Sequence, residues 1–212
     1  MVNQLLRALF IVIIVRPLVL LAMGLNIRRR ELLPAQGPAV IVANHNSHLD
    51  TLVILSLFPL RLLPKVRPVA AADYFLRNPL LAWFALNIIG IIPVKRVTRG
   101  GNPLASSFEA LQRGEILIIF PEGSRGNPEE LTQFKKGIAI ISKKFPDVPI
   151  SPLFLHGLGK ALPRGEAVFV PFFCDAFVGS PRHWSGETES FIKALEQQMS
   201  DLAAEGRFPV WK

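Results

Sequence analysis

Beyond Arg30, short apolar runs alternate with segments of helical pattern, and this alternation constrains the fold more than any other feature of the chain. The runs predict strands, and the segments between them predict helices. Strands are expected at residues 39–43, 68–72, 88–94, 115–120, 148–155 and 166–173. Helices are expected at residues 48–58, 73–87, 103–113, 134–144 and 187–204. This alternation is typical of an α/β fold, here a single mixed sheet flanked by helices.

The N-terminal segment from Leu5 to Leu25 is strongly apolar, but Arg16 and Pro17 interrupt it. An arginine near the middle of a membrane span costs about 2.5–3.5 kcal/mol on insertion scales. A proline at the next position breaks or kinks a helix. The sequence therefore predicts a two-helix membrane anchor, with helices at about residues 3–15 and 17–27 that form a hairpin in one leaflet.

The arginine triplet at residues 28–30 follows this apolar segment directly. A cleaved signal peptide is the alternative to an anchor, but such a basic cluster argues against export. We therefore predict a membrane-associated hairpin at residues 1–29 and one catalytic domain at residues 30–212. Both are expected at the cytoplasmic face of the inner or plasma membrane.

Composition agrees with a protein that works at a membrane surface. The chain has 212 residues, a mean hydropathy of +0.36 and a net charge of +8. A basic, apolar chain suits anionic lipid or nucleic acid. No nucleic-acid-binding module or interleaved basic and aromatic stripe is visible, so we expect no nucleic-acid partner. The single cysteine, Cys174, excludes an internal disulfide and fits a reducing compartment.

The string NHNSHLD at residues 44–50 follows the first predicted strand. In a continuous helix, five residues correspond to about 500° of rotation, so His45 and Asp50 would point about 140° apart. They can meet only if a helix begins between them, and Ser47 is a suitable N-cap for one. An aspartate that accepts from one ring nitrogen fixes the tautomer and leaves the other nitrogen as a base.

Several alternatives apply to this string. Asp50 could serve only as a capping residue and His45 only as a loop histidine. His48 is a competing base or a residue beside the substrate. A metal site of these three residues is a further alternative. No additional cysteine or histidine cluster supports it, because His156 and His183 are distant in sequence, and we expect no metal.

A second string, FPEGSRG at residues 120–126, follows the predicted strand at residues 115–120. Ligands of open α/β sheets bind at the carboxyl ends of strands. Gly123 lets a ligand approach the backbone, Arg125 offers a planar fork for phosphate, and Glu122 can accept from hydroxyl groups. The alternative is a solvated Glu and Arg pair on a surface turn.

Two more blocks complete an ordered series: GIIPVKR at residues 90–96 and VPISPL at residues 148–153. In this order, the four blocks resemble the glycerolipid acyltransferase family over roughly residues 38–155. Two departures weaken any inference about the exact acceptor. Ser124 stands where the family often has threonine, and Gly126 stands where it often has serine.

The resemblance implies that His45 is the general base for the acceptor hydroxyl and that Asp50 orients it. It also implies a set of substrate-binding residues: Lys95, Arg96, Glu122, Gly123, Ser124, Arg125, Lys135 and Lys136. Within that set, Lys95 and Arg96 resemble the cationic side of a phosphate pocket. Lys135 and Lys136 resemble a downstream basic pair that helps to hold phosphate.

The implied activity is transfer of a fatty acyl group from acyl-CoA or acyl carrier protein to the hydroxyl of a lysophospholipid. The expected acceptor is 1-acyl-glycerol-3-phosphate, which would give phosphatidic acid without any cofactor. One alternative is another lysolipid acceptor. A second is a lipid hydrolase with the same His45 and Asp50 pair, although the sequence lacks the Gly-x-Ser-x-Gly nucleophile elbow. A non-catalytic membrane-binding protein would need only the anchor and the basic surface.

Overall fold

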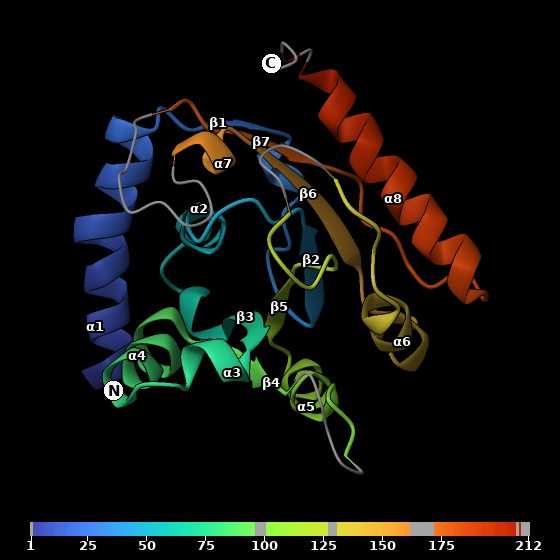
Figure 1. Cartoon of the computed structure of the whole chain (residues 1–212), viewed down its shortest axis with the longest axis horizontal. Helices are drawn as coiled ribbons and strands as arrows, with labels where there is room; N and C mark the ends of the chain where they lie inside the picture. The colour runs from blue at the N-terminus through green and yellow to red at the C-terminus, as the bar shows by residue number, and fades with distance from the viewer. Residues whose placement is uncertain (1, 96–100, 127–130, 162–171, 207, 209–212) are drawn as a thin grey trace.

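The structure, a computed structural model, describes residues 2–95, 101–126, 131–161, 172–206 and 208. Its strands are β1 Asn26–Arg28, β2 Ala39–Ala43, β3 Val66–Ala71, β4 Ile92–Val94, β5 Ile116–Ile119, β6 Ile150–His156 and β7 Asp175–Val178. Its α-helices are α1 Val2–Phe10, α2 Leu49–Leu57, α3 Ala72–Phe75, α4 Pro79–Phe84, α5 Ala105–Gln112, α6 Gly137–Lys144, α7 Leu158–Ala161 and α8 Thr188–Glu205. Figure 1 shows them as helices on both faces of one central sheet.

The sheet has seven strands in the order β1-β7-β6-β2-β5-β3-β4. Every neighbouring pair is parallel except β6 and β7, which are antiparallel, so the predicted single mixed sheet is confirmed. Strand β2 lies between β6 and β5, with Ala43 opposite Leu153 and Val42 opposite Ile119. The carboxyl ends of these three strands therefore meet at one edge of the sheet.

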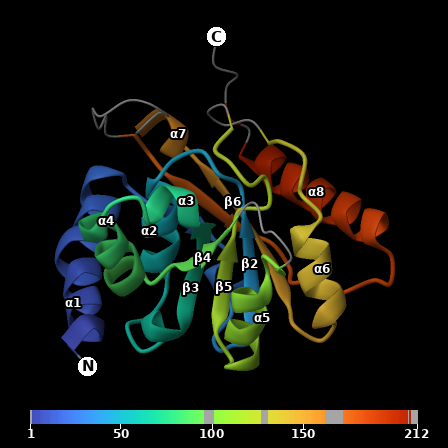
Figure 2. The same ribbon diagram turned by 60° about the horizontal axis from the view of Figure 1, so that its bottom comes forward.

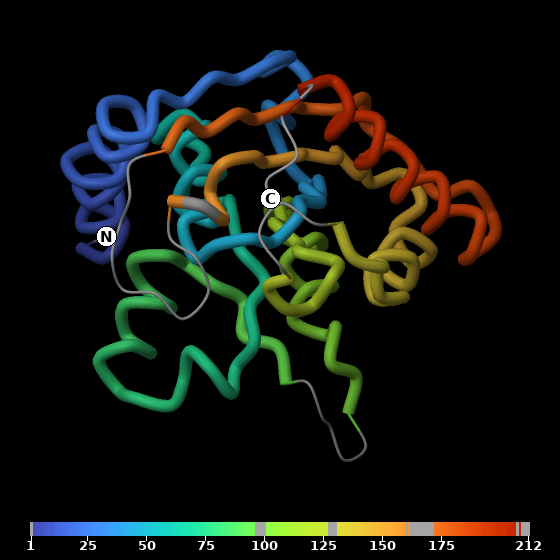
Figure 3. The backbone as a smooth tube through the Cα atoms, turned by 45° about the horizontal axis from the view of Figure 1, so that its top comes forward, coloured from blue at the N-terminus to red at the C-terminus, as the bar shows by residue number. Residues whose placement is uncertain are grey.

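Helices cover both faces of the sheet, as Figure 2 shows, and an apolar core cluster lies on each face. Every residue of β2 is fully buried, as expected for a parallel strand covered on both faces. Ile41 belongs to the core cluster that includes residues of α2 and the N-terminal helix. Val40 and Val42 belong to the cluster that includes residues of α5, α6 and α8. In Figure 3, α8 in red lies on the opposite side of the sheet from α1 in blue.

The N-terminal segment forms one continuous helical segment, Val2–Ala22, so the predicted two-helix hairpin is wrong. Arg16 and Pro17 both have right-handed helical backbone angles. The π-helical turns Ile11–Val15 and Leu18–Ala22 flank them. These wider turns carry the helix past a residue that lacks an N–H donor. The 21-residue segment is long and apolar enough to cross a membrane.

This helical segment packs lengthwise against the sheet layer. The residues that face inward recur every fourth position and are all buried: Arg7, Ile11, Val15, Val19 and Met23. The residues that face outward are large and apolar: Val2, Leu5, Leu6, Leu9, Val12, Ile13, Ile14, Leu20 and Leu21. Strand β1 follows at once and pairs with β7, although its residues fall at the end of the second predicted helix and just beyond it.

Other boundaries also differ from the predictions. The single helix expected at residues 73–87 is two helices, because Asn78 caps α4 and Pro79 begins it. The Asn78 Oδ1 atom accepts from Leu80 N at 2.8 Å and from Leu81 N at 3.2 Å. Only the last three residues of the strand expected at residues 88–94 form a strand, β4, because residues 88 and 89 belong to a π-helical turn, Ala85–Ile89.

At the β1 and β7 edge of the sheet, the strands also differ from those predicted. Of the strand expected at residues 166–173, residues 166–171 lie outside the described residues, and residues 172 and 173 are not in a strand. Strands β1 and β7 were not predicted. Each is only three or four residues long, and neither presents a long apolar run.

Candidate active site

The central feature of the site is the pair formed by His45 and Asp50. His45 follows β2 at the carboxyl edge of the sheet, and Asp50 lies in the first turn of α2. The His45 Nδ1 atom lies 2.8 Å from Asp50 Oδ2, so the predicted contact is confirmed. The Asp50 side chain is fully buried, whereas the His45 side chain is 19% exposed. With Nδ1 on the carboxylate, Nε2 is the ring nitrogen that can take a proton from a substrate.

One carboxylate oxygen of Asp50 accepts hydrogen bonds from three donors. Besides the ring, Asp50 Oδ2 accepts from Asn46 N at 2.7 Å and from Ser47 N at 2.9 Å. Helix α2 begins at Leu49 with His48 as its N-cap, one residue after the predicted N-cap Ser47. Burial raises the pKa of Asp50, and the hydrogen bonds from His45, Ser47 and Asn46 limit that rise.

The residues that follow β5 contact both the ring and the backbone of His45. The ring of Phe120 stacks on the imidazole with centroids 4.1 Å apart. Glu122 is buried, and its Oε1 atom accepts from His45 N at 3.1 Å. The Glu122 Oε2 atom accepts from Thr132 Oγ1 at 2.8 Å. Because both oxygens have protein partners, this geometry favours a positioning role over the predicted contact with a substrate hydroxyl.

The environment of Glu122 also affects its titration. Burial raises the pKa of Glu122, while the hydrogen bonds from Thr132 and from the His45 backbone oppose the rise. These two donors therefore stabilise the charged form of the Glu122 carboxyl group against the effect of burial.

The turn after β5 brings Lys135 onto Gly123. Gly123 has a φ of +75°, and a Cβ atom there would lie 2.5 Å from Lys135 Nζ. The left-handed backbone favours glycine at this position, and the absence of a Cβ atom leaves room for the end of the Lys135 side chain. Lys135 N also donates to Pro121 O at 2.9 Å, which ties the segment before α6 to the turn.

Other predicted substrate-binding residues lie farther out or cannot be placed. Ser124 is exposed on the turn, and Lys136 is exposed at the start of α6. Lys95 is exposed after β4, and β3 separates that strand from β5. Arg96 lies outside the described residues.

Arg125 and His48 belong to the same site. His48 Nε2 lies 3.1 Å from the hydroxyl of Tyr74, and the two rings stack. Partial burial, together with the smaller effects of the charges of Arg125 and His45, lowers the pKa of His48 to about 4. Such a weak base is poorly suited to accept a proton near neutral pH, which favours His45 over His48 as the base.

This combination of a buried His–Asp pair and a basic turn at a sheet edge can be compared with known proteins. The profile of the acyltransferase family matches residues 24–156. The chain belongs to the acyltransferase family. The resemblance found in the four sequence blocks is thereby confirmed, and the match covers more than half of this acyltransferase chain.

Curated relatives carry one recurring name. A chloroplastic 1-acyl-sn-glycerol-3-phosphate acyltransferase of Arabidopsis thaliana is 33% identical over 145 residues, which cover 67% of this chain and 38% of that protein. The chain thus spans about two fifths of the length of the plant relatives it matches. The 1-acyl-sn-glycerol-3-phosphate acyltransferase of Bacillus subtilis is 24% identical, and the match covers 84% of this chain and 88% of that protein.

A solved structure shares the fold. The 1-acyl-sn-glycerophosphate acyltransferase of Thermotoga maritima superposes with a TM-score of 0.72 at 22% sequence identity. The match covers 90% of this acyltransferase and 75% of that chain. At this identity the likeness supports the architecture and not the substrate.

Two positioning residues of this acyltransferase were missed by the sequence analysis. Asn44 is buried, and its amide donates to Leu155 O at 2.8 Å and accepts from Leu155 N at 2.7 Å. It thereby continues the pairing of β2 with β6 up to the residue before His45. Thr132, which donates to Glu122, is ten residues away from it in sequence. An asparagine at a strand end signals such a bond weakly, and nothing in the sequence around Thr132 signals its contact.

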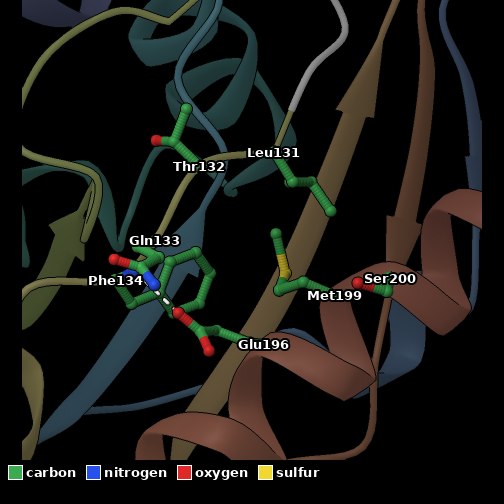
Figure 4. A pocket seen from close by; sticks show the side chains of 7 residues that line it. All are labelled: Leu131, Thr132, Gln133, Phe134, Glu196, Met199 and Ser200. Atoms are coloured by element: carbon green, nitrogen blue, oxygen red, sulfur yellow. Dashed lines mark hydrogen bonds between the residues drawn. The ribbon is translucent and has the colours of Figure 1, made fainter.

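Behind Thr132, a pocket separates residues 131–134 from α8 (Figure 4). It is lined by Leu131, Thr132, Gln133, Phe134, Glu196, Met199 and Ser200. Glu196 Oε1 accepts from Phe134 N at 2.8 Å, which fixes the segment that carries Thr132. No predicted site residue lines this pocket.

Proposed function

We propose that the chain is an O-acyltransferase that moves a fatty acyl group from a thioester to the free hydroxyl of a lysophospholipid. The observation that carries this proposal is the His45–Asp50 pair at the sheet edge, with the Arg125 turn beside it. The names of the relatives favour 1-acyl-glycerol-3-phosphate as the acceptor and phosphatidic acid as the product. Acyl-CoA and acyl carrier protein are both suitable donors, and the proposed chemistry needs no cofactor.

In the proposed reaction, His45 Nε2 takes the proton of the acceptor hydroxyl as its oxygen attacks the thioester carbonyl carbon. A C–O bond forms and the C–S bond breaks. The thiolate leaves and takes up the proton that His45 holds. Asp50 keeps the ring in place and stabilises the imidazolium with its negative charge.

The acceptor phosphate requires cations close to His45. We infer that Arg125 and Lys135 provide them, because both belong to the segments that meet at the turn after β5. Arginine offers phosphate a bidentate fork, and lysine adds a point charge. Lys95, Arg96, Ser124 and Lys136 stay predicted substrate-binding residues.

Incubation with labelled acyl-CoA or acyl carrier protein, with and without several lysolipids, tests the activity. Transfer gives a labelled diacyl product, hydrolysis gives free fatty acid without an acceptor, and an inert binding protein gives neither. The His45→Ala variant should lose about 10²–10⁴-fold in turnover. His183→Ala, which changes an exposed histidine far from the site, is the matched control. Near-normal transfer by folded His45→Ala protein would end the proposal.

We also infer that residues 1–29 associate with the membrane ahead of an acyltransferase domain at residues 30–212. The support is the outward apolar face of the Val2–Ala22 segment. Its other face is buried along the domain, so a segment that crossed the bilayer would have to leave those contacts. We therefore favour a helix that lies along the cytoplasmic surface, consistent with the arginines at residues 28–30.

A tag at Met1 tests this orientation in sealed vesicles of known sidedness. A helix along the surface leaves the tag and the domain open to protease on the same side. A tag protected on the opposite face would show a span, and loss of the tag with a new N-terminus would show a cleaved signal peptide.

A further inference from the structure

A second apolar surface lies on the helix that follows Tyr74. Helix α4 and the π-helical turn after it form one apolar helical stretch, Pro79–Ile89. Three large side chains on it are exposed at a spacing of three residues: Leu80 at 81%, Trp83 at 48% and Leu86 at 41%. The opposite side, with Ala85, Ile88 and Ile89, is buried. We call Leu80, Trp83 and Leu86 the Trp83 face.

The Trp83 face continues the outward face of the N-terminal helix. The rings of Phe10 and Phe84 meet edge to face at 5.3 Å, and Asn3 Nδ2 donates to Asn87 Oδ1 at 2.6 Å. Figures 1 and 2 both show α1 and α4 side by side. Two helices more than 70 residues apart in sequence therefore expose apolar side chains on one side of the molecule.

The Trp83 face also borders the active site. Helix α3 connects the carboxyl end of β3 to α4 and carries Tyr74, whose hydroxyl contacts His48. Leu80 follows Tyr74 by six residues. A lipid that enters between bilayer and protein at this helix would reach the rim of the site near His48.

The charges of the two segments that carry these helices indicate which partner the Trp83 face binds. Residues 1–30 contain five arginines and no acidic residue. Residues 51–95 contain five basic residues and one acidic residue, Asp73. Arg7 is buried, but Arg61, Lys65, Arg77 and Lys95 are exposed. This basic excess, on segments with exposed leucines and a tryptophan, suits the interface of an anionic bilayer, where tryptophan is favoured. A second protein copy would need no such excess of one sign.

We propose that the Trp83 face is a second membrane-contacting surface, which binds the anionic bilayer together with the N-terminal helix and sets the active-site rim against it. This inference rests on the proposed lipid acyltransferase function. Contact at two places would fix the rotation of the domain about α1, which a single helix on a surface leaves free.

Fluorescence of Trp83 tests the contact directly. The chain has three tryptophans, so the double change Trp184→Phe and Trp211→Phe leaves Trp83 as the only reporter. Vesicles of phosphatidylcholine and phosphatidylglycerol with brominated acyl chains should shift its emission to the blue and quench it. Unquenched emission from protein that sediments with the vesicles would overturn the proposal. A blue-shifted emission without vesicles, together with a dimer in solution, would also overturn it.

Vesicle sedimentation measures the contribution of the surface. The double variant Leu80→Glu and Trp83→Ser should partition at least about tenfold more weakly, because the apolar area that enters the interface is lost. Ile140→Glu is the control, since it places the same acid on an exposed apolar position of α6, away from α1 and α4 (Figure 1). Equal partitioning of the double variant and the control would refute the proposal.

Thermal unfolding verifies that the variants are folded before they are compared. Turnover of a dispersed short-chain lysophosphatidate by the unaltered chain tests the acyltransferase proposal separately. Vesicle binding without turnover would refute the acyltransferase proposal and support the membrane contact. Turnover without contact of Trp83 with vesicles would refute the membrane contact and support the acyltransferase proposal.

Discussion

Replacement of Asp50 should separate catalysis from stability, because all three of its donors meet at a single oxygen. His45 Nδ1, Asn46 N and Ser47 N lie within 2.7–2.9 Å of Oδ2. In Asp50→Asn, the amide oxygen can occupy that place and keep all three bonds. The amide nitrogen then falls where Oδ1 is now, a buried atom with no hydrogen-bond partner among the described residues.

The magnitudes follow from this geometry. Asp50→Asn removes a buried charge, which gains stability, but buries an unpaired NH₂ group at a cost of about 1–3 kcal/mol. These effects oppose each other, so the free energy of unfolding should stay within about 1 kcal/mol of the wild type. Asp50→Ala instead leaves two buried backbone N–H groups unpaired, which costs about 2–6 kcal/mol in total. Turnover of Asp50→Asn should still fall about 10²–10⁴-fold, because the imidazolium loses its counter-charge.

Denaturant unfolding and steady-state transfer to a dispersed lysophosphatidate measure the two quantities on the same preparations. Near-normal turnover in Asp50→Asn would mean that Asp50 is only a capping residue. Equal loss of stability in Asp50→Asn and Asp50→Ala would mean that the three donors do not share one oxygen.

Three other changes test the surroundings of the dyad. Arg125→Ala should raise the acceptor KM and leave the donor KM unchanged, with partial recovery in Arg125→Lys; an effect on the donor alone would contradict the phosphate assignment. Thr132→Val should cost about 1–2 kcal/mol in unfolding experiments, because the buried Glu122 loses a donor, and Thr132→Ser should restore it. His48 has a pKa of about 4 when folded against an ordinary value of 6.5, so the unfolded chain binds the extra proton between these pH values. Stability should therefore fall as pH drops from 6.5 to 4, and less so in His48→Gln; identical pH profiles would show that His48 is not shifted.

The sequence predicted the dyad because the argument needed only local geometry. The prediction required a helix that begins between His45 and Asp50, and α2 begins there, at Leu49. The contacts of Glu122 could not be predicted from the sequence, because they do not depend on local geometry. They join His45, Glu122 and Thr132 across two strands and a loop, and no local pattern encodes such a meeting.

The fold shows the same division between local and distant information. Asn78 followed by Pro79 is a typical N-cap and first-turn pair, so the start of α4 could have been predicted from the sequence and was missed. The continuity of the N-terminal helix past Pro17 was not readable in this way. It coincides with tertiary packing of its inner face, which overrides the local preference of proline for a break.

Helix α2 explains how arginines can belong to an otherwise apolar N-terminal segment. Arg16 NH2 donates to Phe58 O at 3.0 Å, and Arg30 NH2 donates to Leu57 O at 2.9 Å, so both guanidinium groups lie at the carboxyl end of α2. Cations are favoured at that end of a helix, as the Asp50 carboxylate is at the other end. The nine residues of α2 span about 13 Å.

Helix α2 thus contacts His45 through Asp50 in its first turn, and it contacts the N-terminal helical segment at its carboxyl end. Arg7 adds a third contact of this kind, since its NH2 donates to Val66 O at 2.8 Å at the start of β3. Each of these three arginines bonds a backbone carbonyl of the domain, so none of them has to enter lipid for the outward face to do so. In the orientation proposed above, rigid elements set the height of the His45 ring above the bilayer, which suits its proposed role as the base for a hydroxyl close to the lipid headgroup.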